Sequence, residues 1–579
     1  MRLAEALRVI NDAKHIVEQV DPVFLACGFT PLHLQTYLTA FLQQRTPSRR
    51  AVCETGVFGD VIGNIRRAAD RDIRTLAIVV EWSDLDPRLG LRSSGGWSPR
   101  LYDQILQTAQ STLTRLDEAI RGASTNSLIA LLLPTLPLPP FAHTPEWESS
   151  SIELALRAEV ASTAMGLGTT VQVVSAQRLD RISPLDARAD ASSELTTGFP
   201  YTMPHAIHVA RLVAEVLRPP QPMKGLIVDL DDTLWRGILG EVGTQGVSWS
   251  LEDRSQVHGL LQQFLASLAE AGVLIGVSSK NDPALVADAL ERPDMILKTN
   301  QVYPVIANWR AKSEAVGTIL STWNVGADSV IFLDDSPMEL AEVAAQHPAI
   351  HGVLFPKNDP QAVLDLLRRL RDLFGKRVLT SDDGLRLESI RTGSVARVAA
   401  VSGVDGGEEF LAHAEAIVTA DFHKSVLNTR AFELLNKTNQ FNLNGRRLTD
   451  TEWRSLLQDN DSFVLALSYQ DRYGPLGTIA VVAGQVVDSG LVIRHWVMSC
   501  RAFARRIEHQ TLRILFEKFD ATQVLLDFHQ TERNGPTREF LCEFFDEETG
   551  PPPLTLSRRR FDERCRPMYH TVHEPASRQ

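Results

Sequence analysis

Short apolar runs that alternate with helical stretches constrain the fold of this chain more than any other feature. TLAIVVEW and SLIALLLPTL in the first third, and GLIVDL and VLIGVSS in the middle, have no alternating polar face. Strands of this kind are buried on both sides, as in a parallel sheet that helices cover on both faces. The pattern therefore predicts two successive doubly wound α/β domains.

The last third of the chain has a different pattern. FVLALSYQ and GTIAVVAGQVVDSGLVIRHWVMS predict a strand meander, and ARRIEHQTLRILFEKF predicts a helix, which together indicate an α+β domain. Prolines at 219, 220 and 222 predict a break after the first domain. We therefore predict an α/β domain over 1–221, a second one over 222–375, a helical linker over 376–415 and an α+β domain over 416–579.

Length, charge and cysteine content narrow the class of protein. A chain of 579 residues accommodates about three or four domains, and its net charge of −12 argues against a nucleic-acid binder, which needs a basic face. The chain has neither a signal-peptide pattern nor an apolar run long enough to span a membrane. The five cysteines are scattered, which predicts reduced thiols. We expect a cytoplasmic protein with no membrane or nucleic-acid partner.

Paired acids follow the first strand of the second domain. GLIVDLDDTLW places Asp229 and Asp231 at the end of that strand, with Thr233 after them. Ligands of open α/β sheets bind at this end of the strands. One carboxylate can attack phosphorus, and the other can protonate the leaving oxygen and later activate water. Both suit Mg²⁺, which prefers oxygen ligands. The alternative is an acidic turn after a core strand.

Three later segments add the other groups that phosphoryl transfer needs. VLIGVSSKND is a strand that ends in hydroxyls, NWRAKSE supplies Lys312, and VIFLDDSP is a strand that ends in Asp334 and Asp335. Each segment has a simpler explanation by itself. Together they supply a nucleophile, a metal site, a hydroxyl donor and a cation for the phosphate oxygens.

These motifs resemble the four motifs of the haloacid-dehalogenase superfamily, which has a Rossmann-like fold. The resemblance implies that Asp229 is the nucleophile and Asp231 the acid/base, with the Asp231 backbone carbonyl on Mg²⁺. It implies that Asp335 completes the metal shell with support from Asp334. The phosphate-binding residues that it implies are Thr233, Ser279, Lys280 and Lys312.

The segment VLIGVSSKND and its distance from the first motif give two further details of the site. The family motif has its hydroxyl directly before a short polar loop, which favours Ser279 over Ser278. Between Leu234 and Ser279 the chain has room for one helix but not for a cap domain. Water is excluded from such a site only by the substrate or by another domain, which favours a bulky or tethered substrate.

Longer stretches resemble the FkbH-like family of polyketide biosynthesis, in subfamily IIIC of this superfamily. They are DLDDTLWRGILGE, ANWRAKSE with FLDDSP, and LLNKTNQFNLNGRR with WVMSCR. The resemblance implies that the chain dephosphorylates 1,3-bisphosphoglycerate and loads the glyceryl unit on the phosphopantetheine arm of an acyl carrier protein. The alternatives are a stand-alone phosphatase of a small phosphate ester with regulatory flanking domains, and a non-catalytic scaffold.

The last domain is similar, in a weaker form, to the acetyltransferase fold. QDRYGPLGTIAVVAG resembles a strand pair of that fold, and NGPTREFLCEFF, which begins at Asn534, resembles its closing helix. Arg501, Arg505 and Arg506 form a basic cluster before a helix. Such a cluster can bind a phosphate or a phosphopantetheine arm, and the alternative is a solvated helix face.

Two further features of this domain suggest acyl transfer. Cys500 stands directly before the arginine cluster, where positive charge and a helix start lower a thiol pKa and favour a nucleophilic thiolate. The alternative is a buried, inert cysteine. A polar run predicts a lining for the acyl group or carrier, the alternative being a capped helix end. It contains Asn436, Lys437, Asn439, Gln440 and Asn442.

The first domain loosely resembles the SGNH hydrolases, which have a nucleophilic serine just after their first strand. At that place this chain has Ala26, Cys27, Gly28, Phe29 and Thr30, with no serine. Near the end of the domain His205 is present, but the acid that precedes the family's histidine is missing. We expect this domain to bind a partner or to support the other domains rather than to hydrolyse a substrate.

Overall fold

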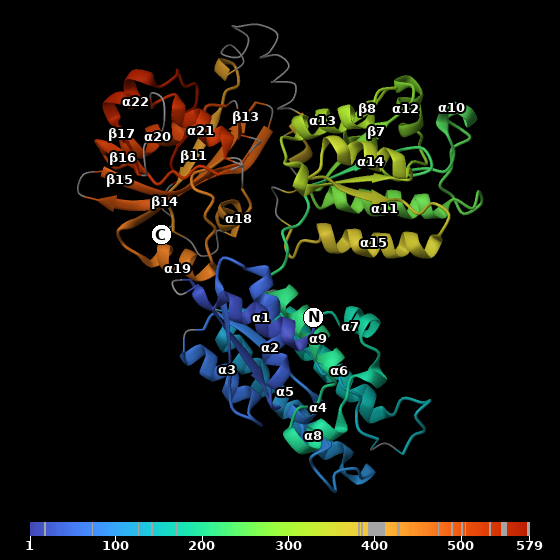
Figure 1. The fold of residues 1–579 in the computed structure, drawn as a ribbon. Helices are drawn as coiled ribbons and strands as arrows, with labels where there is room; N and C mark the ends of the chain where they lie inside the picture. Colours follow the sequence, from blue (N-terminus) through green and yellow to red (C-terminus); the bar gives the residue numbers. More distant parts are fainter. Residues whose placement is uncertain are drawn as a thin grey trace. The chain divides into compact units, whose positions relative to one another are not determined.

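The structure is a computed structural model that divides into two compact units, Met1–Pro220 (unit 1) and Gln221–Gln579 (unit 2). Unit 1 contains one parallel sheet, and unit 2 contains a second parallel sheet and a mixed sheet (Figure 1). The described residues are 1–16, 19–71, 73–124, 127–140, 143–168, 171–379, 383, 386–388, 390–391, 411–424, 429–438, 441–472, 474–487, 490–499, 502–503, 505–531, 534–545 and 553–575. Most of the predicted linker, 376–415, lies outside them.

The sheet of unit 1 is parallel, with strand order β2-β1-β3-β4-β5. Its strands are β1 (Val20–Cys27), β2 (Arg50–Thr55), β3 (Thr75–Val79), β4 (Leu128–Leu132) and β5 (Val171–Val173). Its helices are α1 (Leu3–Asp12), α2 (Leu32–Arg45), α3 (Val61–Asp70), α4 (Trp82–Leu85), α5 (Tyr102–Ser124), α6 (Ser151–Gly166), α7 (Ala176–Ile182), α8 (Ala191–Thr197) and α9 (Met203–Leu217).

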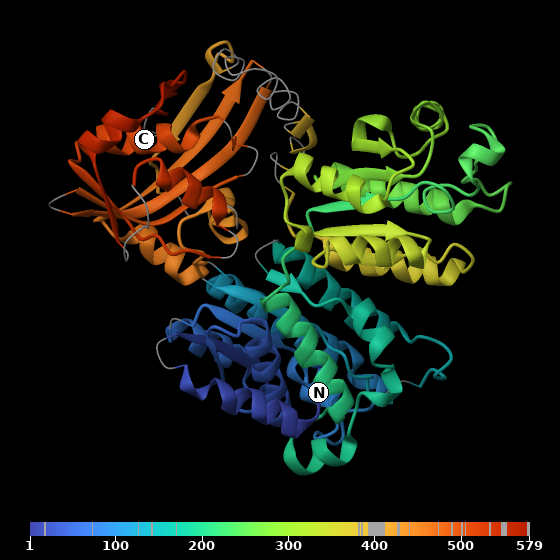
Figure 2. The same ribbon diagram turned by 45° about the horizontal axis from the view of Figure 1, so that its top comes forward.

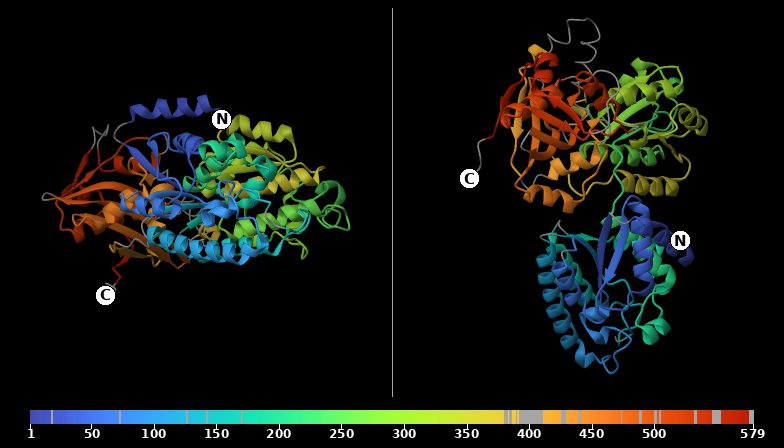
Figure 3. Two further views of the ribbon diagram at one scale, coloured as in Figure 1. Left: turned by 90° about the horizontal axis from the view of Figure 1, so that it is seen from below. Right: turned by 60° about the vertical axis from the view of Figure 1, so that its left-hand side comes forward.

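Helices cover both faces of this sheet, which can be followed in Figure 3. Alternate strand residues pack against α3, α5 and α6 on one face and against α2 and α9 on the other. This burial explains why the strands are apolar throughout.

The parallel sheet of unit 2, which we call the central sheet, has strand order β10-β9-β6-β7-β8. Its strands are β6 (Gly225–Val228), β7 (Leu274–Ser279), β8 (Val302–Ala307), β9 (Val330–Asp334) and β10 (His351–Leu354). Its helices are α10 (Leu239–Val242), α11 (Gln256–Glu270), α12 (Pro283–Leu290), α13 (Lys312–Trp323), α14 (Pro337–Gln346) and α15 (Pro360–Phe374). One face packs on α11 and α15 and the other on α13 and α14 (Figure 2).

Two glycines fix the distance of α13 from the central sheet. A Cβ atom at Gly225 or Gly276 would lie 2.5 Å or 2.8 Å from the ring of Trp323, the last residue of α13. The indole N–H of Trp323 also donates a hydrogen bond of 2.6 Å to the carbonyl of Tyr303. This close packing holds the whole helix in place, including Lys312 at its start.

The mixed sheet of unit 2 has strand order β17-β16-β15-β14-β13-β11-β18, with β12 pairing beside β15. Its strands are β11 (Ile417–Asp421), β12 (Phe441–Asn442), β13 (Ser462–Asp471), β14 (Gly474–Val487), β15 (Gly490–Met498), β16 (Gln523–Leu526), β17 (Leu554–Ser557) and β18 (Thr571–His573). Its helices are α18 (Thr429–Lys437), α19 (Asp450–Gln458), α20 (Ile507–Lys518), α21 (Gly535–Cys542) and α22 (Arg558–Arg564).

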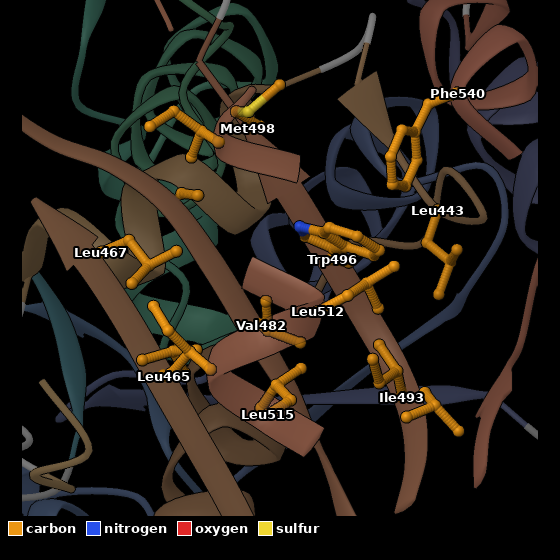
Figure 4. Packing of buried hydrophobic residues seen from close by; sticks show 14 of the residues in the cluster. Leu443, Leu465, Leu467, Val482, Ile493, Trp496, Met498, Leu512, Leu515 and Phe540 are labelled. Atoms are coloured by element: carbon orange, nitrogen blue, oxygen red, sulfur yellow. The ribbon is translucent and has the colours of Figure 1, made fainter. Parts of the chain in front are cut away.

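The larger core of this sheet lies under α20, α21 and α22, and a smaller one lies under α18 and α19. Figure 4 shows Trp496 of β15 in the larger core, with Leu443, Leu512 and Phe540 around it. The prediction of two doubly wound α/β domains followed by an α+β region is therefore confirmed at the level of the sheets. The domain boundaries and the finer family assignments stay predictions. Among the described helices, none is both long and apolar enough to cross a membrane.

A buried chain of polar side chains joins the sheet of unit 1 to α9. Ser183 Oγ lies 2.9 Å from His205 Nδ1, and His205 Nε2 lies 3.0 Å from Thr135 Oγ1. Thr135 and Tyr201 in turn donate hydrogen bonds to the carboxylate of Glu81. All five side chains are buried. His205 is therefore part of the core, and burial lowers its pKa to about 3.

The buried His205 should make the stability of unit 1 depend on pH. The folded state keeps His205 neutral, whereas the unfolded state takes up a proton near pH 6.5. The free energy that neutral His205 contributes to folding is thus complete above pH 6.5. It is lost as the pH falls below that value, by up to about 1.4 kcal/mol per pH unit. Urea unfolding at several pH values gives the free energy of unfolding as a function of pH. Below pH 6.5 this free energy should fall less steeply with falling pH for His205→Gln than for the wild type. The exposed His15→Gln is the control, and an unchanged slope for His205→Gln would contradict this account.

Candidate functional site

The acids and hydroxyls that the sequence singled out converge at the carboxyl edge of the central sheet. Asp229 follows β6, Ser279 ends β7 and Asp334 ends β9. β6 pairs with both β7 and β9, so these three strand ends are neighbours. Lys312 begins α13, which packs against β7 and β8. Parallel strands thus bring together residues that are more than one hundred positions apart in the chain.

Lys312 is the centre of a buried ion-paired group. Its Nζ lies 2.8 Å from Asp229 Oδ1 and 2.6 Å from Asp334 Oδ2, and all three residues are buried. Burial alone would lower the pKa of Lys312, but the two carboxylates raise it above its usual range. Burial raises the pKa of Asp229 to about 7, against the opposing effect of Lys312 and with that of Asp334. One ammonium group therefore serves two carboxylates and leaves one negative charge uncompensated.

Three carboxylates of this edge are close enough to hold one metal ion. Oxygen atoms of Asp229, Asp334 and Asp335 all lie within 4.8 Å of one another. Each carboxylate has two oxygens, so the bonds to Lys312 leave others for an ion. A donor set of carboxylate oxygens alone suits a hard divalent cation. These residues therefore fit the Mg²⁺ ion that the motifs predict.

Lys357 is a site residue that the sequence reasoning missed. It follows β10, and its Nζ lies 2.7 Å from Asp232 Oδ2 and 2.8 Å from Asp335 Oδ2. When all four carboxylates are ionised, the two ammonium groups leave two negative charges in this ion-paired cluster, which favours a divalent cation. The signal in the sequence was weak, because a single lysine after a short edge strand is common.

Asp231 lies beside this cluster with its carboxylate bound by three N–H groups. Oδ1 accepts from the indole of Trp235 at 2.9 Å and from the backbone of Leu239 at 3.1 Å. Oδ2 accepts from the side-chain amide of Asn281 at 3.0 Å. Asn281 and Trp235 are buried and belong to the site, although the sequence reasoning gave them no role there.

The other predicted phosphate-binding residues lie in two different environments. Ser279 and Thr233 are buried at the site, and the Thr233 hydroxyl lies 3.5 Å from Asp335 Oδ1. Lys280 is partly exposed and forms an ion pair of 2.8 Å with Glu339 at the start of α14. A role of Lys280 on phosphate would need this pair to open.

The predicted acyl-transfer residues are only partly within the described residues. Cys500, Arg501, Asn439 and Gln440 lie outside them. Asn534 is buried and donates hydrogen bonds to the carbonyls of Asn442 and His529. Asn442 is also buried and bonds the backbone of Thr438 and of Gly445. The structure uses these amides to hold the chain, and a role for them in acyl binding stays a prediction.

The remaining polar residues of this set also have partners within the protein. The Asn436 side chain accepts from the backbone of Leu448. Lys437 pairs with Glu433 at 3.2 Å.

The two described arginines before α20 differ in their surroundings. Arg505 is buried beside Asp471, at 3.7 Å, and over the ring of Tyr469. Arg506 has a left-handed backbone, with φ of 54°, and donates to the carbonyl of Pro567. Burial of Arg505 does not favour the open basic cluster that the sequence suggested, and carrier binding by both residues stays a prediction.

The corresponding sheet edge of unit 1 differs in chemistry. Cys27, at the end of β1, is buried and its thiol lies 3.3 Å from the carbonyl of Phe29. Burial raises the pKa of this thiol far above its usual range, so Cys27 is held as an unreactive thiol. Among the described residues of this edge, His205 bonds Thr135 and Ser183 and not Cys27.

Comparison with known proteins supports the fold of the chain. No protein-family model and no curated protein matches the sequence. The N-terminal part of the protein BF1531 from Bacteroides fragilis, which contains a phosphatase domain and was crystallised in complex with Mg, is similar in structure. The likeness covers 65% of this chain and 100% of that chain, at 18% identity and a TM-score of 0.50. At this identity it shows a shared fold.

A second solved structure is similar over a smaller part of the chain. It is an uncharacterized protein from Corynebacterium glutamicum, which covers 27% of this chain and 98% of its own at 19% identity. Its TM-score of 0.19 is too low to support an inference.

Removing the central cation should destabilise unit 2. Lys312→Met leaves Asp229 and Asp334 buried without their counter-charge, which should lower the free energy of unfolding at pH 8 by about 3–5 kcal/mol. Lys280→Met is the matched control, because it breaks a partly exposed pair and should cost under about 1 kcal/mol. Chemical unfolding measures both variants, and equal losses would contradict the central place of Lys312.

Proposed function

We propose that this chain is a Mg²⁺-dependent phosphatase whose nucleophile is Asp229. The observation that carries the proposal is the cluster of Asp229, Asp334 and Asp335 around Lys312 at the carboxyl edge of a parallel sheet. The fold shared with a protein that contains a phosphatase domain complexed with Mg supports the same reaction class. The proposed fold family is the haloacid-dehalogenase superfamily.

The proposed reaction has two steps. An Asp229 oxygen attacks phosphorus, the bond to the leaving oxygen breaks, and Asp231 gives that oxygen a proton. Asp231 then takes a proton from water, which attacks phosphorus and releases Asp229 and inorganic phosphate. Lys312 and Ser279 bind the phosphoryl oxygens in both steps. Bound Mg²⁺ would polarise these oxygens and reduce their repulsion of Asp229.

The finer proposal names the substrate and the acceptor. On the resemblance to the FkbH-like family, the phosphate comes from 1,3-bisphosphoglycerate and the glyceryl unit passes to an acyl carrier protein. In this scheme the Cys500 thiolate attacks the acyl carbon, the bond from that carbon to the phosphate oxygen breaks, and inorganic phosphate leaves. The carrier thiolate then attacks the thioester, which transfers the acyl group and releases the Cys500 thiolate. A stand-alone phosphatase of a small phosphate ester is the alternative, and it needs only the central sheet.

Replacing the nucleophile should abolish phosphate release. Asp229→Asn keeps the shape of the side chain but removes the attacking oxygen anion and one metal ligand. Release of phosphate from a phosphomonoester should fall to background, while circular dichroism stays that of the wild type.

Asp229→Asn removes a metal ligand as well as the nucleophile, so the need for metal is tested separately. Chelation with EDTA should stop the wild-type reaction, and added Mg²⁺ should restore it. Turnover by Asp229→Asn near the wild-type rate, or full activity after chelation, would refute the proposed function.

Replacing the proposed acyl acceptor should separate the two activities. Cys500→Ala should block loading of a holo carrier protein from 1,3-bisphosphoglycerate and spare ester cleavage at the central sheet, because an acyl phosphate reacts with a thiolate without the aspartate site. Intact-mass measurement of the carrier detects the loading. Cys542→Ala, at an exposed cysteine of the same region, is the control. Normal loading by Cys500→Ala would favour direct attack by the carrier thiol.

A further inference from the structure

The side-chain amide of Asn281 connects two groups of the central site. Its Nδ2 lies 3.0 Å from Asp231 Oδ2 and 3.0 Å from Ser279 Oγ. Asn281 is 2% exposed, so these bonds are shielded from water. An amide nitrogen has two hydrogens, which is the number that these two acceptors require.

The two acceptors of this amide agree with its orientation. The amide turns its nitrogen toward Asp231 Oδ2. This orientation suits the ionised form of Asp231, which takes the proton from water in the second step, because an ionised carboxylate can only accept hydrogen bonds. The same nitrogen then donates to the Ser279 oxygen. A hydroxyl that accepts such a bond keeps its own hydrogen for another acceptor, and the phosphoryl oxygen is the acceptor that the proposed reaction brings.

The other oxygen of Asp231 is held independently of Asn281. Trp235, in the loop after β6, and the backbone of Leu239, at the start of α10, bind Oδ1. Asn281 binds Oδ2 from the loop after β7. Asn281 is therefore the contact between Asp231 and the strand end that carries the phosphate-binding hydroxyl.

We propose that Asn281 is a positioning residue that aligns the acid/base Asp231 and the phosphate-binding Ser279 on one substrate. This role rests on the proposed function, because it concerns how Asp231 and Ser279 are held in position relative to each other. One N–H orients the carboxyl group that protonates the leaving oxygen. The other N–H directs the Ser279 hydroxyl toward the phosphate.

This role makes a specific prediction about leaving groups. Asn281→Leu removes both N–H groups at similar volume. A poor leaving group such as ethoxide needs a proton from Asp231, whereas nitrophenolate leaves without one. The kcat/KM for ethyl phosphate should therefore fall on the order of 10²-fold, and that for p-nitrophenyl phosphate by less than about tenfold. Because Asp231 also activates water in the second step, the variant should show a burst of nitrophenol.

Three further variants separate positioning from other effects. Ser279→Ala removes a phosphate contact that both substrates share, so it should reduce both kcat/KM values by equal factors. Trp235→Phe removes one donor to Asp231 alone, so it should change the leaving-group dependence without raising KM. Asn64→Leu removes a buried asparagine of unit 1 that bonds backbone at Cys27 and Val57, and it controls for loss of folding.

The outcomes distinguish the proposal from its premise. Equal losses for both substrates with Asn281→Leu, in protein that melts as a folded chain, would refute the positioning role and leave the phosphatase intact. A wild-type chain that turns over neither substrate with Mg²⁺ would refute the proposed function itself. A large loss for ethyl phosphate only, with the burst, supports both.

Discussion

The bond of Lys312 to both Asp229 and Asp334 is the interaction on which the site of unit 2 depends. These carboxylates end neighbouring parallel strands, where their mutual repulsion would oppose the pairing of β6 with β9. The lysine reaches them from the first turn of α13, and that helix is fixed by Trp323 against two glycines of the sheet. Packing at one end of a helix thus sets the position of a charge at the other.

The strands and the main acids of this site could be predicted from sequence because both follow from one constraint. A strand covered by helices on both faces must be apolar until it leaves the core, so the first polar residues mark the carboxyl edge. This rule predicts Asp229 and Asp334, whereas the choice of Ser279 over Ser278 rests on the family resemblance. Lys312 is predicted because NWRAKSE, between two such strands, resembles a family motif.

Residues that act through a partner could not be found in the same way. Asn281 and Trp235 matter because of where their N–H groups point, and neither residue type indicates a site by itself. Lys357 binds Asp335 from the loop after the edge strand β10, and no sequence pattern indicates that these two residues meet. The side-chain amides of Asn442 and Asn534 bond backbone groups in the structure, and their predicted part in acyl or carrier binding stays a prediction. Composition cannot distinguish an amide that binds backbone from one that binds a ligand.

The two parallel sheets show what separates a structural polar cluster from a functional one. In unit 1 the carboxylate of Glu81 accepts hydrogen bonds from Thr135, Leu136 and Tyr201, so no oxygen is left for an outside group. Such a network stabilises one conformation. In unit 2 the acids around Lys312 and Lys357 exceed the lysines by two charges. Because buried charge without compensation is costly, a divalent cation would stabilise that cluster when its acids are ionised. Both edges are carboxyl edges of five-stranded parallel sheets, although the strand orders differ. The balance of donors, acceptors and charge, rather than the kind of sheet, is what favours the proposed chemistry at the edge of unit 2.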